Sequence, residues 1–209
     1  MTGVQYVPTG AYGGSYNFVN STDQVRAGAV VNAPNRYATL SAWIWARQTT
    51  GNDQVAGFRY PGYSNGSLSM SVVGGYGILG RLVYPDSGFD NLFSGRVLSS
   101  NAWHHVVIVR SNLWFGMYLD GVMDTNIVVP DKDLYTGGNF NVGDDSAPIV
   151  PVKGLVDEVR MYNRALTSNE VWGLYETIAV TNRQLVVNGT PAPHGVSTPY
   201  DYGTNTIIR

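Results

Sequence analysis

Residues 154–166 read GLVDEVRMYNRAL, a segment that passes from a strand pattern directly into the start of a helix. Leu155 to Tyr162 has the apolar and β-branched content of a buried strand. The next four residues, TSNE at 167–170, form a capping box, and apolar residues follow at helical spacing: Val171, Leu174 and Tyr175. The segment therefore predicts a last strand that leads into one short helix near 168–176.

Strand patterns also dominate the chain before this segment. Apolar and polar residues alternate over 40–45, 103–110 and 113–119. Asp120-Gly121 then supplies the tight turn of a hairpin. The 25 glycines and 10 prolines help to separate such segments at intervals of roughly eight to twelve residues. This rhythm predicts an all-β sandwich of two antiparallel sheets.

The composition narrows the class of protein further. A chain of 209 residues, 44% of them hydrophobic, can bury one large core, and no apolar run approaches the roughly 18 residues of a membrane span. The net charge of −2 lacks the basic footprint that binds nucleic acid. Because cysteine is absent, disulfide scaffolds, thiolate zinc sites and thiol catalysis are excluded.

Four segments, in order, resemble one known family. They are GSYNFV at 14–19 with QVR at 24–26, LSAWI at 40–44, WHHV at 103–106 with MYLDG at 117–121, and the closing segment 154–166. The pattern is similar to the laminin-G-like group of the concanavalin-A-like lectin/glucanase superfamily. The resemblance implies a jelly-roll sandwich over residues 14–176. It leaves an N-terminal arm at 1–13 and an extended C-terminal arm at 177–209.

Enzymatic activity is not expected. Glycoside hydrolysis needs two carboxyl groups about 5–9.5 Å apart on either side of one bond. The hydrolase branch of the superfamily carries an E-x-D-x-x-E strand, which is absent here. Asp157 and Glu158 are neighbours on a strand and point to opposite faces, while Glu170 belongs to the helix cap. The sequence thus predicts a non-catalytic protein that requires no cofactor.

Asp157 is the candidate structural anchor. Strict alternation places it on the face of Leu155, Val159 and Met161, towards the core, where its carboxylate must accept backbone N–H groups. A calcium ligand is the alternative, since the resemblance implies that a calcium site is possible. Further acidic residues that could take part lie in loops: Asp131, Asp133, Asp144 and Asp145.

The histidine pair in WHHV is not expected to form a metal site. His104 and His105 are consecutive in a strand, so their side chains point to opposite faces. His105, on the face of Trp103 and Val107, is predicted to be a hydrogen-bonded core histidine. The chain also lacks the G-x-S-x-G elbow that presents a nucleophilic serine.

Aromatic side chains are the remaining candidates for recognition. If Leu40, Ala42 and Ile44 line the core, Trp43 and Trp45 lie on the opposite face of that strand. Exposed aromatic rings stack on sugars or anchor protein interfaces, unless the chain's own loops cover them, which is the reading favoured for Trp43. The candidate residues for contact with a glycan or a protein partner are Trp45, Trp114, Tyr118, Tyr200, Tyr202, Ile207 and Ile208.

Two functions from different classes fit these features. The first is a structural and interaction protein on the surface of a virus particle, such as a bacteriophage capsid-decoration or fibre subunit. Its arms would dock on protein neighbours, with residues 200–208 on an adjacent subunit, so a homo-oligomer is expected. Such a subunit can also bind cell-surface glycans. The second function is that of a stand-alone extracellular carbohydrate-binding, lectin-like module.

Overall fold

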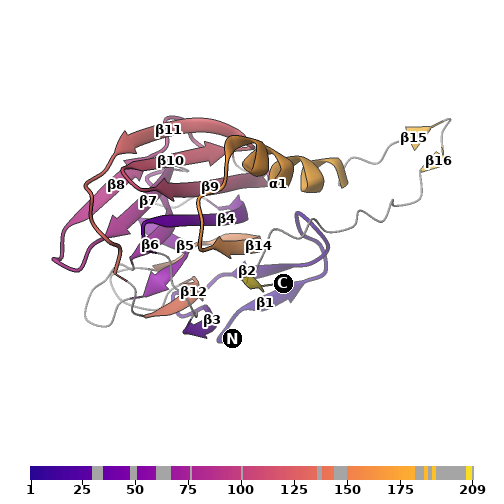
Figure 1. The fold of residues 1–209 in the computed structure, drawn as a ribbon. Helices are drawn as coiled ribbons and strands as arrows, with labels where there is room; N and C mark the ends of the chain where they lie inside the picture. Colours follow the sequence, from indigo (N-terminus) through magenta and orange to yellow (C-terminus); the bar gives the residue numbers. More distant parts are fainter. Residues whose placement is uncertain are drawn as a thin grey trace.

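A computed structural model shows two β-sheets packed face to face, with one helix on the outside of the first sheet (Figure 1). The structure describes residues 1–29, 35–47, 51–59, 67–75, 77–99, 101–135, 138–143, 150–181, 186–187, 190–191 and 206–208. Among these residues, the helix is the only one and no helix has the length and apolar character needed to span a membrane. The predicted sandwich of two antiparallel sheets with a single helix is confirmed.

The strands are short and, with one exception, antiparallel to their neighbours. The first sheet runs in the order β1 (Gln5–Val7), β2 (Ser15–Phe18), β14 (Gly154–Tyr162), β4 (Tyr37–Ala46), β9 (His104–Ser111), β10 (Trp114–Leu119) and β11 (Val122–Val128), and β17 (Thr206–Ile208) pairs with β14. The second sheet runs in the order β3 (Val25–Ala29), β12 (Asn139–Val142), β5 (Asn52–Arg59), β6 (Leu68–Val73), β7 (Gly77–Val83) and β8 (Phe89–Phe93), with β13 (Val150–Pro151) parallel to β5. A separate hairpin joins β15 (Val186–Val187) and β16 (Thr190–Pro191).

The core lies between the two sheets and is built from alternate residues of each strand. Leu40, Ala42 and Ile44 of β4 are fully buried, as the alternation predicted. They belong to the same apolar cluster as Leu68 and Met70 of β6 in the opposite sheet. Each strand thereby gives one face to this core and leaves its other face for the outside of the sandwich.

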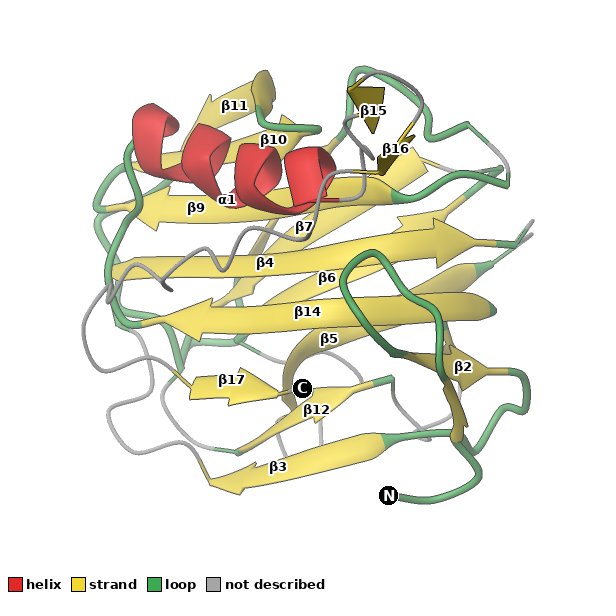
Figure 2. Cartoon of the chain, turned by 90° about the vertical axis from the view of Figure 1, so that its right-hand side faces the viewer, coloured by secondary structure: helices red, strands yellow, loops and turns green. Residues whose placement is uncertain are grey.

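The helix α1 (Ser168–Thr181) lies across the outer face of the first sheet (Figure 2). The predicted capping box is confirmed, since Thr167 Oγ1 accepts the Glu170 N–H at 3.3 Å and Glu170 Oε2 accepts the Thr167 N–H at 2.8 Å. The helix ends at Thr181 instead of near residue 176. Its added turn carries Ile178, which is buried against Trp43 of β4, so tertiary packing extends the helix beyond its sequence pattern.

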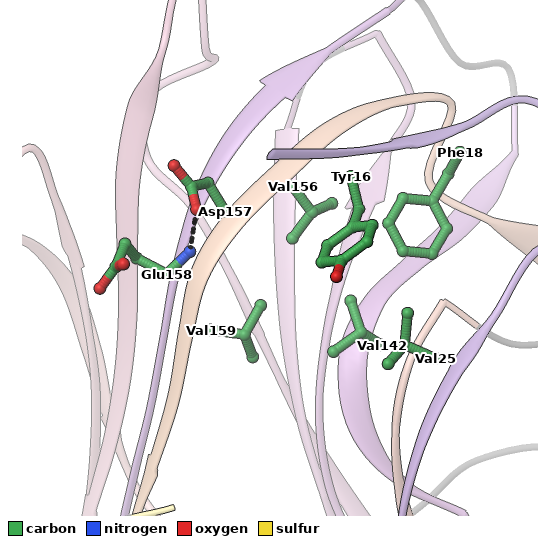
Figure 3. Close-up of a pocket in the computed structure, with 8 residues that line it drawn as sticks. All are labelled: Tyr16, Phe18, Val25, Val142, Val156, Asp157, Glu158 and Val159. Atoms are coloured by element: carbon green, nitrogen blue, oxygen red, sulfur yellow. Dashed lines mark hydrogen bonds between the residues drawn. The ribbon is translucent and has the colours of Figure 1, made fainter. Parts of the chain in front are cut away.

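A β-bulge interrupts β14 at Glu158. The register to β4 shifts between Asp157 and Arg160, and Glu158 adopts a positive φ of 47°. Val156 and Val159 both point into the core, whereas Asp157 and Glu158 point away from it (Figure 3). The expectation that Asp157 faces the core is therefore wrong, because the extra residue of the bulge reverses the faces of the strand.

Both predicted arms contact the sandwich, the C-terminal arm through its last described strand. β1 pairs with β2, Thr2 bridges to Gln24, and Ala11 is fully buried beside Trp43. At the other end, β17 pairs with residues 159–161 of β14, next to the segment 154–156 that pairs with β2 (Figure 2). One edge of β14 thus receives strands from both ends of the chain.

Candidate functional site

The outer face of the second sheet carries a row of polar residues. Residues that are directly paired across strands share a face, and the register aligns Asn141, Gly57, Ser69, Arg81 and Asn91 over five neighbouring strands. All five alternate with residues of the apolar core. The row therefore lies on the outside of the sandwich, opposite the face that packs against the first sheet.

Amide groups near this row lack hydrogen-bond partners. Gln54 is paired with Ser71, so it lies on the same face as Ser69, and it is only 2% exposed. Its Nε2 atom and the Oδ1 atom of Asn141, which is 1% exposed, are both buried and without a partner, as is Oδ1 of Asn52. A buried polar atom without a partner is costly, so such groups are satisfied by a ligand or by water. These three atoms are themselves enclosed, so a ligand can reach this face only where its side chains are open to solvent.

The end of the face is aromatic and open to solvent. Phe89 and Phe93 flank Asn91 on the same face of β8 and are 60% and 57% exposed. The Arg81 guanidinium lies 5.3 Å from the centroid of the Phe89 ring, and its Nε donates to Asn91 Oδ1 at 2.7 Å. Burial lowers the pKa of Arg81. Arg81 and Asn91 therefore form a hydrogen-bonded pair beside the exposed ring of Phe89.

The aromatic residues chosen from the sequence lie elsewhere, on the outer face of the first sheet. Tyr118 is covered by α1 and is 3% exposed, with its hydroxyl 2.9 Å from Ser168 Oγ, so it cannot contact a partner. Trp114 is half-buried against the apolar cluster under α1. Trp45 is also half-buried and packs edge to face on Trp103. The helix α1 and the contact between Trp45 and Trp103 therefore cover part of the outer face on which alternation placed these aromatic residues.

The remaining candidate contact residues belong to the C-terminal segment. Tyr200 and Tyr202 lie outside the described residues. The backbone of Ile207 and Ile208 pairs with Arg160 and Val159 of the same chain. In the single chain this part of the segment therefore lies on its own sandwich, and docking on a neighbouring subunit stays a prediction.

Of the two acidic pairs considered as calcium ligands, the structure describes one. Asp131 and Asp133 both pair with the guanidinium of Arg36, the latter at 2.5 Å. Asp144 and Asp145 lie outside the described residues. Within the described part of the chain, no group of three or more His, Cys, Asp or Glu side chains could hold a metal ion. A calcium site therefore finds no support in the acidic pair that the structure describes.

Asp157 fastens the N-terminal loop to β14. Its Oδ2 accepts the Tyr12 N–H at 2.8 Å, and its Oδ1 accepts the Glu158 N–H at 2.8 Å within the bulge. Burial raises the pKa of Asp157, and the backbone hydrogen bonds oppose this shift. A Cβ atom at Gly10 would lie 2.5 Å from Oδ2, so this close approach requires glycine.

Replacing Asp157 with alanine should lower the free energy of unfolding by ~1–3 kcal/mol, because two backbone donors lose their acceptor. Urea unfolding with and without EDTA measures the loss. Asp86→Ala, which removes an exposed carboxylate that pairs with Lys132, is the control and should have a smaller effect. An unchanged midpoint for Asp157→Ala would contradict the anchor role. A loss that EDTA alone reproduces would favour calcium instead.

The cavity beside this bulge is too small to be the binding site. It has a volume of about 20 Å³, room for a single water, and is lined mainly by apolar side chains (Figure 3): Tyr16, Phe18, Val25, Val142, Val156, Asp157, Glu158 and Val159. A sugar ring or a peptide side chain does not fit there. Recognition therefore does not use this cavity.

The two packed antiparallel sheets define a jelly-roll sandwich. A laminin G family model, described as concanavalin A-like lectin/glucanases superfamily, matches residues 19–172. The chain belongs to this family, as the sequence motifs predicted. A search of curated proteins found no match.

Solved structures share the fold at low sequence identity. The binding domain of botulinum neurotoxin serotype G is 14% identical, with a TM-score of 0.69, over 91% of this chain and 48% of that one. The binding domain of Paraclostridial mosquitocidal protein 1 is 16% identical, with a TM-score of 0.68, over 88% and 48% of the two chains. The chain thus spans about half the length of these toxin domains.

A third similar structure covers a larger share of its chain. Domain 4 of AbnA, a GH43 extracellular arabinanase from Geobacillus stearothermophilus solved in complex with arabinotriose, is 22% identical, with a TM-score of 0.64. The match covers 84% of this chain and 82% of that domain. At this identity the likeness shows the fold alone.

Proposed function

We propose that the protein is a carbohydrate-binding module that holds a glycan against the outer face of its second sheet. The observation that carries the proposal is the solvent-open edge at β8, where the exposed rings of Phe89 and Phe93 lie beside the hydrogen-bonded pair of Arg81 and Asn91. Sugar hydroxyls both donate and accept hydrogen bonds, as side-chain amides do. The C–H face of a sugar ring is apolar and packs on aromatic rings.

The similar structures support this assignment. Domain 4 of the arabinanase was solved with arabinotriose, and the toxin domains are named binding domains. Glycoside hydrolysis is not part of the proposal. Asp157 binds backbone N–H groups, Glu158 pairs with Arg160, and Glu170 caps α1, so each of these carboxylates already has a structural partner.

Removing both rings should weaken glycan binding. The double variant Phe89→Ala/Phe93→Ala is expected to lower affinity about 10-fold or more, since each aromatic contact contributes roughly 0.5–1.5 kcal/mol. Titration calorimetry with a ligand found by glycan-array screening, beginning with arabinotriose, gives the affinity. Tyr37→Ala, which removes a 50% exposed ring on the first sheet, is the control and should bind normally. Absence of binding to any arrayed glycan, or equal loss in the control, would contradict the site.

We infer as a second candidate that the module is a subunit of a larger assembly, such as a virion surface, as a capsid-decoration or fibre protein. The supporting observation is that β17 joins the sandwich through main-chain pairing at a sheet edge. A strand from a neighbouring copy can make the same hydrogen bonds. The arm would then link subunits by exchanging this strand, and the glycan-binding face would remain free to bind a cell surface.

Deleting residues 190–209 tests this role. The sandwich should remain folded and its melting temperature should fall by only a few degrees, because the deletion removes three residues paired to the sandwich, in β17, and the two residues of β16, which pair only with β15. Light scattering should show that the full chain is oligomeric and that the truncated chain is monomeric. A monomeric full chain, or a truncated chain that still assembles, would contradict the exchange of the arm.

A further inference from the structure

Three side chains that are separate in the sequence form a hydrogen-bond chain at one end of the first sheet. Ser99 lies in the loop before β9, His104 is the first residue of β9, and Asp120 follows β10 in the turn to β11. Ser99 Oγ is 2.8 Å from His104 Nε2, and His104 Nδ1 is 2.9 Å from Asp120 Oδ2. Neither the glycan-binding proposal nor the strand exchange involves these residues.

The chemistry of the three groups determines which atom donates and which accepts in each hydrogen bond. An ionised carboxylate only accepts hydrogen bonds, so His104 Nδ1 carries the proton that it donates to Asp120. In the neutral ring Nε2 is then an acceptor, and it faces the Ser99 hydroxyl. The Ser99 backbone N–H points at the same nitrogen at 3.2 Å. The imidazole is therefore oriented as a base towards Ser99 Oγ.

Asp120 is held in place independently of the histidine. Its second oxygen, Oδ1, accepts the backbone N–H of His105 at 3.0 Å. Burial alone would raise the pKa of Asp120, but the hydrogen bonds from His104 and from the His105 backbone outweigh burial and lower it. The carboxylate is therefore ionised at neutral pH, and a carboxylate in this position selects the tautomer of His104.

Accessibility matches the demands of a nucleophile. The Ser99 residue is exposed, whereas the side chain of His104 is only 15% exposed. The turn after Asp120 packs against α1, since a Cβ atom at Gly121 would lie 2.9 Å from both Trp172 and Tyr175. Trp172 is 45% exposed and provides an apolar surface next to this turn. The base is thus shielded while the hydroxyl is open to a substrate.

We propose that Ser99, His104 and Asp120 form a nucleophilic serine site that accepts acyl groups from small carboxylic esters, such as O-acyl groups on sugars. Ser99 Oγ bonds to the carbonyl carbon and passes its proton to His104 Nε2. The ester C–O bond then breaks, and the departing alkoxide takes that proton, which leaves an acyl-serine and an alcohol. Water then attacks the acyl carbon as His104 Nε2 takes its proton. The acyl carbon–Oγ bond breaks, Ser99 Oγ takes that proton from His104, and the carboxylic acid and the free serine result. This activity does not depend on glycan binding.

Covalent labelling distinguishes this site from a hydrogen-bond chain that only fastens the loop to β9. Intact-mass analysis and peptide mapping after treatment with a fluorophosphonate should show one adduct, at Ser99. p-Nitrophenyl acetate should give a burst of about one equivalent of nitrophenol. His104→Gln should slow labelling by roughly 10²–10⁴-fold, the usual contribution of a general base. Ser99→Ala should abolish both signals.

Two further variants complete the test. Asp120→Asn keeps an oxygen for the His105 N–H but can donate to His104, so it should slow labelling as well. Ser21→Ala, which removes an exposed serine of the β2–β3 loop, is the control and should label normally. Labelling of Ser99 no faster than that of Ser21, or labelling that His104→Gln leaves unchanged, would overturn the proposal. His104→Gln provides this answer even if Asp120→Asn does not fold.

Discussion

Replacing Trp43 with alanine is expected to lower the free energy of unfolding by about 3–5 kcal/mol, the range for a large aromatic side chain removed from a core. Trp43 is 5% exposed. Its ring stacks on both His105 and Tyr175, with centroid distances of 5.2 and 5.8 Å, and these two rings are 6.2 Å from each other. Trp43 also contacts Ile178 of α1. The substitution therefore removes a buried contact between β4 and the second half of the helix.

Urea unfolding followed by circular dichroism measures this loss. Trp172→Ala is the matched control, since Trp172 also packs on Tyr175 but is 45% exposed, and it should cost clearly less. Hydrogen exchange provides a second readout, because the last turn of α1 should lose protection in Trp43→Ala before the sheet does. If Trp43→Ala lowers the free energy of unfolding by less than about 1 kcal/mol, other contacts hold the helix on the sheet.

Acid should destabilise the protein through His105. Burial lowers the pKa of His105 to about 3, with the charge of Arg160 acting in the same direction and Asp120 opposing it. An unfolded histidine has a pKa near 6.5. Between these two values the unfolded chain binds one proton more than the folded chain, so stability falls as the pH falls, by up to ~1.4 kcal/mol per pH unit.

The measurement is the slope of unfolding free energy against pH between about 6.5 and 3. His105→Gln should have a flatter slope than the native chain, because the carboxyl groups that also titrate in this range are common to both proteins. The variant should be less stable at neutral pH, because it lacks the imidazole that forms the 2.8 Å hydrogen bond between His105 Nε2 and Ser41 Oγ. Equal slopes would show that His105 does not titrate as a buried neutral group.

The sequence predicts the architecture well because its strongest signals are local. The alternation over 40–45 and the TSNE capping box at 167–170 each depend on neighbours in sequence, and both are confirmed. The bulge at Glu158 could not be seen by alternation, which assumes a period of two. A signal was present nonetheless, since the core-facing Val156 and Val159 are three residues apart.

The candidate sites were harder to predict because each is assembled across strands. Ser69 and Ser71 alternate with Met70, which marks a strand with a polar outer face, but only the register shows that Asn141 and Arg81 lie in the same row. Likewise, no motif links Ser99 to Asp120. Both contact His104, because β9 and β10 are paired and bring the two loops at their ends together.

The position of β14 has a consequence for synthesis on the ribosome. This strand lies between β2 and β4, so residues 154–162 must be inserted between segments that were made more than 100 residues earlier. Translation at ≈ 5–20 residues per second leaves the edges of β2 and β4 unpaired for several seconds. During that interval they can pair wrongly with other nascent chains, and chaperones would be needed most before residue 162 leaves the exit tunnel.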